Sequence, residues 1–258
     1  MRKHFISCGT GNPLKDYLKN FYDKRLLTIF LFGISSGFPW VMIGSAMSAW
    51  LKEEGLSRSA IGLFGAVFIS FSINFLWSPL VDRLKLPIIH SLLGQRRSWI
   101  LLTQCLIAAG CIALAGVSPQ YGLLIPGLAA MMVSISSATQ DIAIDAYRID
   151  IIDQNEPEKL AAAASMATSG WWTGFAGLGA IPFFLVDMSG VGWQNMYFLL
   201  AAIVGLLMIP TLFAKEPETD REQIHQALTE KYQHHEVIVE VSEGLLWWTH
   251  CHFGKCYL

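Results

Sequence analysis

Six long apolar segments constrain the fold of this 258-residue chain more than any other feature. Each is close to the roughly 20 residues that an α-helix needs to cross the hydrocarbon core of a bilayer. Their approximate limits are 26–50, 61–81, 99–117, 121–143, 160–186 and 193–214, and five of them contain no Asp, Glu, Lys or Arg before their last residues. Six such segments joined by short loops cannot form a water-soluble core. The sequence therefore predicts an all-α membrane protein built as a six-transmembrane-helix bundle.

Composition and charge exclude several other classes of protein. Hydrophobic residues make up 53% of the chain and charged residues 15%, whereas about 25% charged is usual in soluble domains. The formal net charge is −2 and no basic run is present, so nucleic acid is not an expected partner. The five cysteines have no even spacing that predicts a disulfide framework, and His250, Cys251, His252 and Cys256 match no usual zinc pattern. We therefore expect no metal and no other cofactor.

The two ends of the chain are predicted to lie outside the spans. Residues 1–25 are expected to be a cytoplasmic segment and not a signal peptide, because about 25 apolar residues follow without a small-residue cleavage site. Residues 14–27 alternate apolar and basic groups, which fits either an amphipathic helix on the membrane surface or a solvated lead-in. Residues 215–258 contain no long apolar run and are expected to form a poorly ordered cytoplasmic tail after the 26–214 transporter domain.

Lysine and arginine are distributed unequally over the two sides of the predicted bundle. The two terminal segments and the loops after the second and fourth spans together carry sixteen of the 18 basic residues. The other side carries only Lys52 and Arg58. Because basic residues accumulate in cytoplasmic loops, we expect both ends of the chain to lie in the cytoplasm.

A polar stripe at the end of the fourth apolar segment holds the candidate chemistry. On a helix, Ser134, Ser137, Asp141, Asp145 and Arg148 fall three or four residues apart and therefore share one face. Carboxylates beside a membrane span are costly, so they face a bundle interior, a cavity or a polar partner. Asp141 and Asp145 are the candidate carboxylates for proton coupling or for a gate.

The depth of Asp141 in the membrane decides between these roles. With a rise of about 1.5 Å per residue from residue 121, Asp141 lies about 30 Å along the helix, near the edge of a hydrocarbon core about 30 Å thick. At this level we expect a cytoplasmic charge relay that locks one conformation, made of Asp82, Arg83, Arg96, Arg97 and Arg148. If the fourth span is tilted or starts later than residue 121, Asp141 lies deeper in the hydrocarbon core, where it can carry a proton. Simple solvation at the interface is the third interpretation.

Three groups inside the spans are candidate substrate contacts. Gln140 precedes Asp141, Asn74 lies in the middle of the second span, and Trp171 lies about 11 residues into the fifth. Trp171 can stack on a sugar face, although tryptophan is also common in membrane-interface belts. Asn74 can face a substrate or bond a neighbouring helix with equal ease.

Small residues recur at a spacing of four in two of the spans. Gly33 and Gly37 lie in the first span, and Gly170 and Gly174 lie in the fifth. This spacing lets helix backbones approach closely in lipid, although glycine is also tolerated in membrane helices without any contact. We expect part of these glycines to mark contacts between spans.

Two stretches within the loop between the second and third spans resemble a known motif. Asp82 and Arg83, with GQRR at 94–97, are similar to the G-x-x-x-D-R-x-G-R-R loop of the major facilitator superfamily, with Ser78 in place of its first glycine and an insertion between the two parts. More specifically, the chain resembles the bacterial muropeptide permeases of the AmpG type. The matching stretches are GISSGFP at 33–39, WSPLVDR at 77–83, GQRRSW at 94–99, SATQDIAIDAY at 137–147 and GWQNMY at 192–197.

The resemblance implies a function that the residues alone do not. It implies proton-coupled import of anhydromuropeptides, which are cell-wall fragments, across the bacterial inner membrane for peptidoglycan recycling. Its implied partners are a small-molecule substrate, protons and the lipid bilayer, and acetyl-coenzyme A is the alternative substrate because related transporters carry it. The family has at least twelve spans in two halves that hold the substrate between them. We therefore expect a truncated N-terminal half, completed by a homodimer or by a second six-helix half.

Two alternatives belong to other functional classes. A remnant or accessory membrane subunit would only pack against a partner. An intramembrane aspartyl hydrolase would use Asp141 and Asp145, but adjacent turns of one helix do not place two carboxylates across a scissile bond, and no glycine-x-glycine-aspartate sequence is present. The sequence predicts a transporter and not an enzyme.

Overall fold

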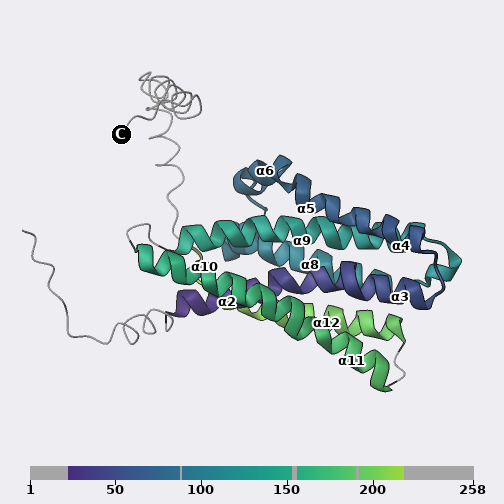
Figure 1. Ribbon diagram of the computed structural model, residues 1–258. Helices are drawn as coiled ribbons and strands as arrows, with labels where there is room; N and C mark the ends of the chain where they lie inside the picture. Colours follow the sequence, from purple (N-terminus) through teal and green to yellow (C-terminus); the bar gives the residue numbers. More distant parts are fainter. Residues whose placement is uncertain (1–22, 88, 153–155, 190–191, 218–258) are drawn as a thin grey trace, which may run out of the picture. The chain divides into compact units, whose positions relative to one another are not determined.

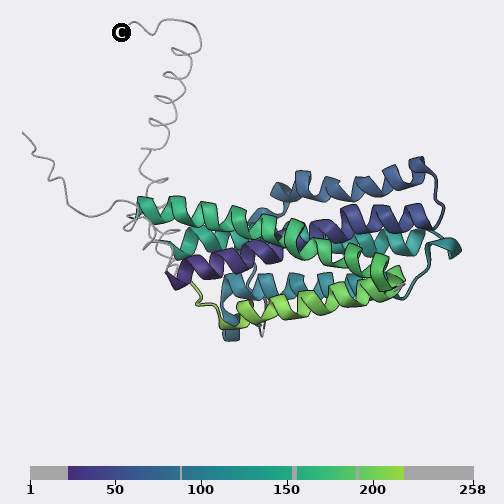
Figure 2. The same ribbon diagram turned by 60° about the horizontal axis from the view of Figure 1, so that its bottom comes forward.

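The described part of the chain is a bundle of membrane-spanning helices. The computed structural model describes residues 23–87, 89–152, 156–189 and 192–217, and it contains helices and no strands within these ranges. Six helical segments in this part are long and apolar enough to cross a membrane, and they run alongside one another in Figures 1 and 2. The predicted all-α six-span bundle is confirmed, and the chain is a multi-pass membrane protein.

Three of the spans are single helices and three combine several helical segments. The third span is α8 (Gln95–Ala115), the fourth is α9 (Leu124–Ile151) and the sixth is α12 (Trp193–Phe213). The segments of the first span are α2 (Lys24–Val41), the π-helical η1 (Met42–Ala46) and α3 (Met47–Glu53). Those of the second are α4 (Arg58–Phe64), η2 (Gly65–Phe68), α5 (Ile69–Ile73) and η3 (Asn74–Leu76), and those of the fifth are α10 (Pro157–Trp172), the π-helical η5 (Thr173–Leu178) and α11 (Gly179–Ser189). The connections contain α6 (Ser78–Arg83), α7 (Ile89–Leu93) and η4 (Pro119–Tyr121).

The first span forms the centre of the bundle. Of its most apolar 18 residues 67% are buried, compared with 17% in the second span and 22% in the fifth. The helix α2 packs against α10, and α8 packs against both α9 and α12. The second and fifth spans are therefore the least buried of the six.

Glycine permits the close approach of the first and fifth spans. A Cβ atom added to Gly37 would lie 2.1 Å from the carbonyl oxygen of Trp171, and one added to Gly174 would lie 2.2 Å from that of Ile34. Gly33 and Gly170 meet the opposing backbone in the same way. The two pairs of glycines spaced four apart thus form one seam between α2 and the fifth span, as their spacing led us to expect.

Both spans of this seam contain a π-helical segment, which follows the glycines in the first span and includes Gly174 in the fifth. The segment η1 begins three residues after Pro39, and η5 begins directly after Trp172. The hydroxyl of Tyr197 in α12 donates a 2.9 Å hydrogen bond to the carbonyl oxygen of Met42, the first residue of η1. Single π-helical turns are frequent at functional sites because they redirect the side chains around them.

Acceptor groups fix the starts of three helices. Asp23 caps α2 by accepting a 2.9 Å hydrogen bond from the Arg25 amide, and Ser57 caps α4. The start of α8 is capped by Glu216, whose carboxylate accepts from the amides of Arg96 at 2.7 Å and Arg97 at 3.2 Å. A negative charge is favourable at the N-terminus of a helix, so Glu216 ties the chain after the sixth span to the start of the third.

Candidate functional site

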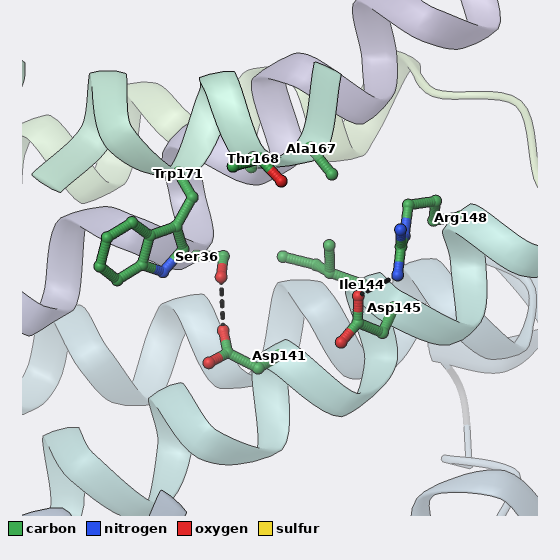
Figure 3. Close-up of a pocket in the computed structure, with 9 residues that line it drawn as sticks. Ser36, Asp141, Ile144, Asp145, Arg148, Ala167, Thr168 and Trp171 are labelled. Atoms are coloured by element: carbon green, nitrogen blue, oxygen red, sulfur yellow. Dashed lines mark hydrogen bonds and ion pairs between the residues drawn. The ribbon is translucent and has the colours of Figure 1, made fainter. Parts of the chain in front are cut away.

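A pocket between the first, fourth and fifth spans contains both of the predicted carboxylates. It has a volume of about 370 Å³ and is lined by Gly33, Ser36, Asp141, Ile144, Asp145, Arg148, Ala167, Thr168 and Trp171. Figure 3 shows the side chains of α10 on one wall and those of α9 on the other. Asp141, Ile144, Asp145 and Arg148 enter the same space because residues three and four apart share one face of a helix.

The carboxylate of Asp141 accepts a hydrogen bond from the first span. The hydroxyl of Ser36 donates a 2.6 Å hydrogen bond to Asp141 Oδ1, and the carboxylate is partly buried. Because α9 begins at Leu124, Asp141 lies about 26 Å along the helix at a rise of about 1.5 Å per residue. That distance is shorter than the hydrocarbon thickness of about 30 Å, so a polar partner such as Ser36 is needed to offset the cost of a carboxylate in the span.

Asp145 and Arg148 form an ion pair at the other end of the pocket. Arg148 Nη2 donates to Asp145 Oδ1 at 3.0 Å, and the side chain of Asp145 is 66% exposed. This pair lies within one turn of α9 and joins no other helix. Figure 3 shows the pair beside Ile144, separated along α9 from Asp141.

Gln140 lies in a different environment from its neighbour Asp141. Its side chain is fully buried and its Nε2 donates a 2.8 Å hydrogen bond to Ser35 Oγ. Gln104 of α8 donates to the same oxygen at 2.8 Å, and Thr211 of α12 donates to Gln104 Oε1 at 3.0 Å. The structure thus places Gln140 in a buried polar network that connects the first, third, fourth and sixth spans, outside the pocket lining.

The two other candidate substrate contacts are also separated from each other. Trp171 lines the pocket, stacks on Phe175 with ring centroids 5.2 Å apart and meets the edge of Trp40 at 5.8 Å. Asn74 begins η3 at the end of the second span and is not among the residues that line the pocket. Of the three predicted contacts, the structure brings only Trp171 beside the carboxylates.

The residues of the predicted charge relay divide into separate groups. Arg96 is 7% exposed and donates to Asp82 at 2.5 Å and to Asp150 at 2.8 Å. Arg97 donates instead to the backbone carbonyls of Thr211 and Leu212. Arg83 is exposed at the end of α6, and Arg148 pairs with Asp145. The structure therefore contains an Asp82–Arg96–Asp150 group distinct from the group in the pocket.

Several residues at the same end of the bundle were not singled out from the sequence. Arg25 Nη2 donates to Asp23 at 2.8 Å and to Glu156 at 3.2 Å, and Lys159 donates to Glu156 at 2.7 Å. This network joins the start of the first span to the start of the fifth. The hydrogen bond from Arg25 lowers the pKa of Asp23, and that from Lys159 lowers the pKa of Glu156.

Metal coordination has no visible candidate in the described ranges. Within them, no three His, Cys, Asp or Glu side chains gather closely enough to hold an ion. The four histidines and cysteines considered near the C-terminus fall outside the described residues, as do most of the N-terminal segment and the tail.

Comparison with known proteins places the chain among transporters. A family model described as Major Facilitator Superfamily matches residues 29–250. A Rickettsia felis protein named "Putative transporter AmpG 4" is 36% identical over 207 residues, which are 80% of this chain and 49% of that protein. The "Anhydromuropeptide permease" of Escherichia coli K12 is 33% identical over 201 residues, which are 78% of this chain and 39% of the permease. The chain thus spans about half the length, or less, of these curated relatives, and the matches point to a transporter and not to an enzyme.

Proposed function

The chain belongs to the major facilitator superfamily, and on this premise we propose that it is one half of a proton-coupled importer of anhydromuropeptides in the bacterial inner membrane. The substrate class comes from the similarity to a protein named as an anhydromuropeptide permease. Halves of these transporters are parallel repeats that hold the substrate at their interface. A second six-helix half, from the same polypeptide, a second copy or another chain, completes the substrate site in this proposal.

The observation that carries the proposal is the carboxylate of Asp141 inside the fourth span. Ionisable residues in spans are costly and mark substrate pathways and proton relays. Asp141 lines a pocket together with Trp171 and accepts a hydrogen bond from Ser36 of another span. We assign it the coupling or gating role, with Asp145 as the second carboxylate and Trp171 as the substrate contact in the pocket. Gln140 and Asn74 do not line the pocket. They can contact the substrate only if it reaches beyond the pocket or if the helices move.

The Asp82–Arg96–Asp150 group is the proposed conformational lock. It connects α6, the start of α8 and the end of α9, so movement of any of these three elements breaks at least one ion pair. Such switching of ion pairs between states is common in conformational transitions.

The orientation in the membrane is also part of the proposal. Arg25, Arg96, Arg148 and Lys159 lie at the end of the bundle where α2 and α10 begin, while Lys52 and Arg58 flank the opposite connection between α3 and α4. Because basic residues favour the cytoplasmic side, we place the first end, and with it both termini, in the cytoplasm.

Uptake of labelled anhydromuropeptide by cells that lack their own permease tests the proposal. Cells expressing the chain, alone or with the C-terminal half of the E. coli relative, should accumulate the label only while the proton gradient is maintained. The full-length relative is the positive control, and membrane insertion of the chain is measured in parallel. Absence of uptake both by the chain alone and by the chain with the C-terminal half, despite correct insertion and an active control, would contradict transport. That result would favour an accessory membrane subunit.

A further inference from the structure

Arg148 differs from Arg25, Arg96 and Arg97, which lie at the same end of the bundle, in how its guanidinium is bonded. Arg96 uses Nε and Nη1 on two carboxylates, and Arg97 uses Nε and Nη2 on two carbonyl oxygens. Arg25 donates from Nε and from both Nη atoms. Arg148 donates from Nη2 to Asp145, whereas its Nε is buried and has no hydrogen-bond partner among the described residues.

The unpartnered Nε lies on a side chain that lines the pocket. A buried donor without an acceptor is unfavourable, so the position gains free energy when an acceptor reaches it. The guanidinium side chain is 29% exposed, and Figure 3 shows it at the end of the pocket opposite Trp171. Arg148 is therefore accessible from the pocket while its hydrogen bonding is incomplete.

The present partner of Arg148 is readily exchanged. The side chain of Asp145 is 66% exposed and the pair is an i,i+3 contact within α9. Exposed ion pairs of this kind contribute little to stability, because water competes for both charges. An incoming carboxylate that engages Nε and Nη2 together would form the bidentate arrangement that guanidinium groups favour.

We propose that Arg148 is a recognition residue for a carboxylate of the transported molecule, and that Asp145 occupies its guanidinium when this carboxylate is absent. The inference rests on the proposed function in one respect, that the ligand is the molecule carried. The pocket already contains the carboxylates of Asp141 and Asp145 beside the single guanidinium of Arg148. When a monoanion replaces Asp145, one negative charge still lies next to the guanidinium. A dianion places a second negative charge there, which the carboxylates of the pocket repel.

Binding of two matched sugars to the full chain, purified in detergent, tests this assignment. The probes are N-acetylmuramic acid, which has one carboxylate, and the same sugar with that carboxylate converted to the primary amide. Isothermal titration should show that the acid binds at least about tenfold more tightly, the fold-change expected of a charge-assisted hydrogen bond. N-acetylglucosamine 6-phosphate, the dianionic probe, should bind more weakly than the acid.

Four variants separate recognition from a structural role. In Arg148→Gln the acid and the amide should bind equally, and in Arg148→Lys the preference for the acid should be reduced, because an ammonium is a point charge without the planar fork. Asp145→Asn should tighten binding of the acid but not of the amide, since it removes the competing carboxylate. Arg58→Gln, at the opposite end of the bundle, is the control that should keep the wild-type preference.

Four results would overturn the inference. Three of them are equal affinity of the wild type for acid and amide, an undiminished preference in Arg148→Gln, and no measurable binding of the acid up to about 10 mM. Tighter binding of the phosphate than of the acid would also overturn the assignment to a carboxylate. This experiment measures binding, so its result can be interpreted even if the uptake experiment fails. Conversely, a negative binding result would not decide whether the chain imports anhydromuropeptide, which the uptake experiment tests separately.

Discussion

At the residue scale, two adjacent serines in α2 separate the pocket from the interior of the bundle. Ser36 donates to Asp141 in the pocket, whereas Ser35 accepts hydrogen bonds from Gln104 and Gln140 in the buried network. Neighbouring residues point about 100° apart around a helix, so one short polar stretch serves both environments. The same geometry places Gln140 and Asp141 on different sides of α9.

The bond between Ser36 and Asp141 leads to the first prediction. Asp141→Asn should abolish uptake wherever the chain supports it, because the amide cannot carry the proton or the charge. Ser36→Ala should reduce uptake by roughly tenfold, which corresponds to one hydrogen bond to a charged group. Thr28→Ala is the control, since that hydroxyl bonds only a carbonyl of its own helix. Undiminished uptake by Asp141→Asn, with normal amounts in the membrane, would exclude both roles of this carboxylate.

The second prediction concerns the cap at the start of α2. Asp23→Ala should lower the free energy of unfolding by about 1 kcal/mol at pH 7, as is typical for the loss of an N-cap. The folded-state pKa of Asp23 is below its ordinary value of 3.8, so its ionised form stabilises the folded state above that pH. The contribution is then lost as the pH falls through the folded-state pKa.

Unfolding in detergent followed between pH 7 and pH 3 provides the measurement. The difference between wild type and Asp23→Ala should shrink below about pH 4. Asp23→Asn should retain most of the cap without this pH dependence, because asparagine is an equally good N-cap. A difference that grows toward low pH would show that the carboxylate is not stabilised by Arg25.

Single residues could be predicted from the sequence only where helical spacing decides their position. The shared face of Asp141, Asp145 and Arg148 follows from their spacing, and the pocket contains all three. The partners of Asp141 and Arg96 could not be found in this way, because Ser36 and Asp150 lie on other elements and are fixed by packing. Glu216, which caps α8 from 120 residues away, carries no local signal at all.

At the scale of elements, the glycine seam determines where the fifth span lies. The backbone contacts at Gly37 and Gly174 leave no room for a side chain, and they bring Trp171 next to the carboxylates of α9. The spacing of four predicted a contact of this kind but not which helices meet. The π-helical segments of these two spans were not predicted, since they depend on how the surrounding helices pack.

The third prediction compares two glycines in helix interiors. Gly37→Ala should destabilise the protein by about 1–3 kcal/mol, because the added methyl group forces the backbones of the first and fifth spans apart. Gly205→Ala in α12 should be neutral or stabilising, since nothing lies within 4 Å of its added Cβ and alanine is the better helix former. Thermal unfolding of the two variants measures the contrast, and equal stabilities would show that the seam can relax.

At the scale of the whole molecule, the exposed faces of the second and fifth spans are the surface that a second six-helix half would cover. These spans are far less buried than the first, and their exposed residues include large apolar side chains such as those of Leu63, Ile69 and Phe184, as expected for contact with helices or lipid. The number of spans could be predicted from hydropathy alone, because length and composition suffice. The exposure of individual spans could not, because it depends on the order in which they pack.

The fourth prediction applies if a second copy completes the transporter. Leu63 in the second span is 73% exposed and Ile112 in the third is 51% exposed. In a chain without other cysteines, Leu63→Cys should form disulfide-linked dimers in membranes on mild oxidation, whereas Ile112→Cys should not. Crosslinking through Ile112→Cys alone would place the contact between copies on the wrong face for a shared substrate site.

The central claim is that these six spans couple import to protons, and uptake into proteoliposomes measures this directly. The chain is reconstituted with the C-terminal half of the E. coli relative, and labelled anhydromuropeptide is supplied outside. We predict accumulation when the outside is made more acidic than the inside, and its loss when a protonophore dissipates the gradient. Accumulation that is equal with and without the gradient would contradict the account.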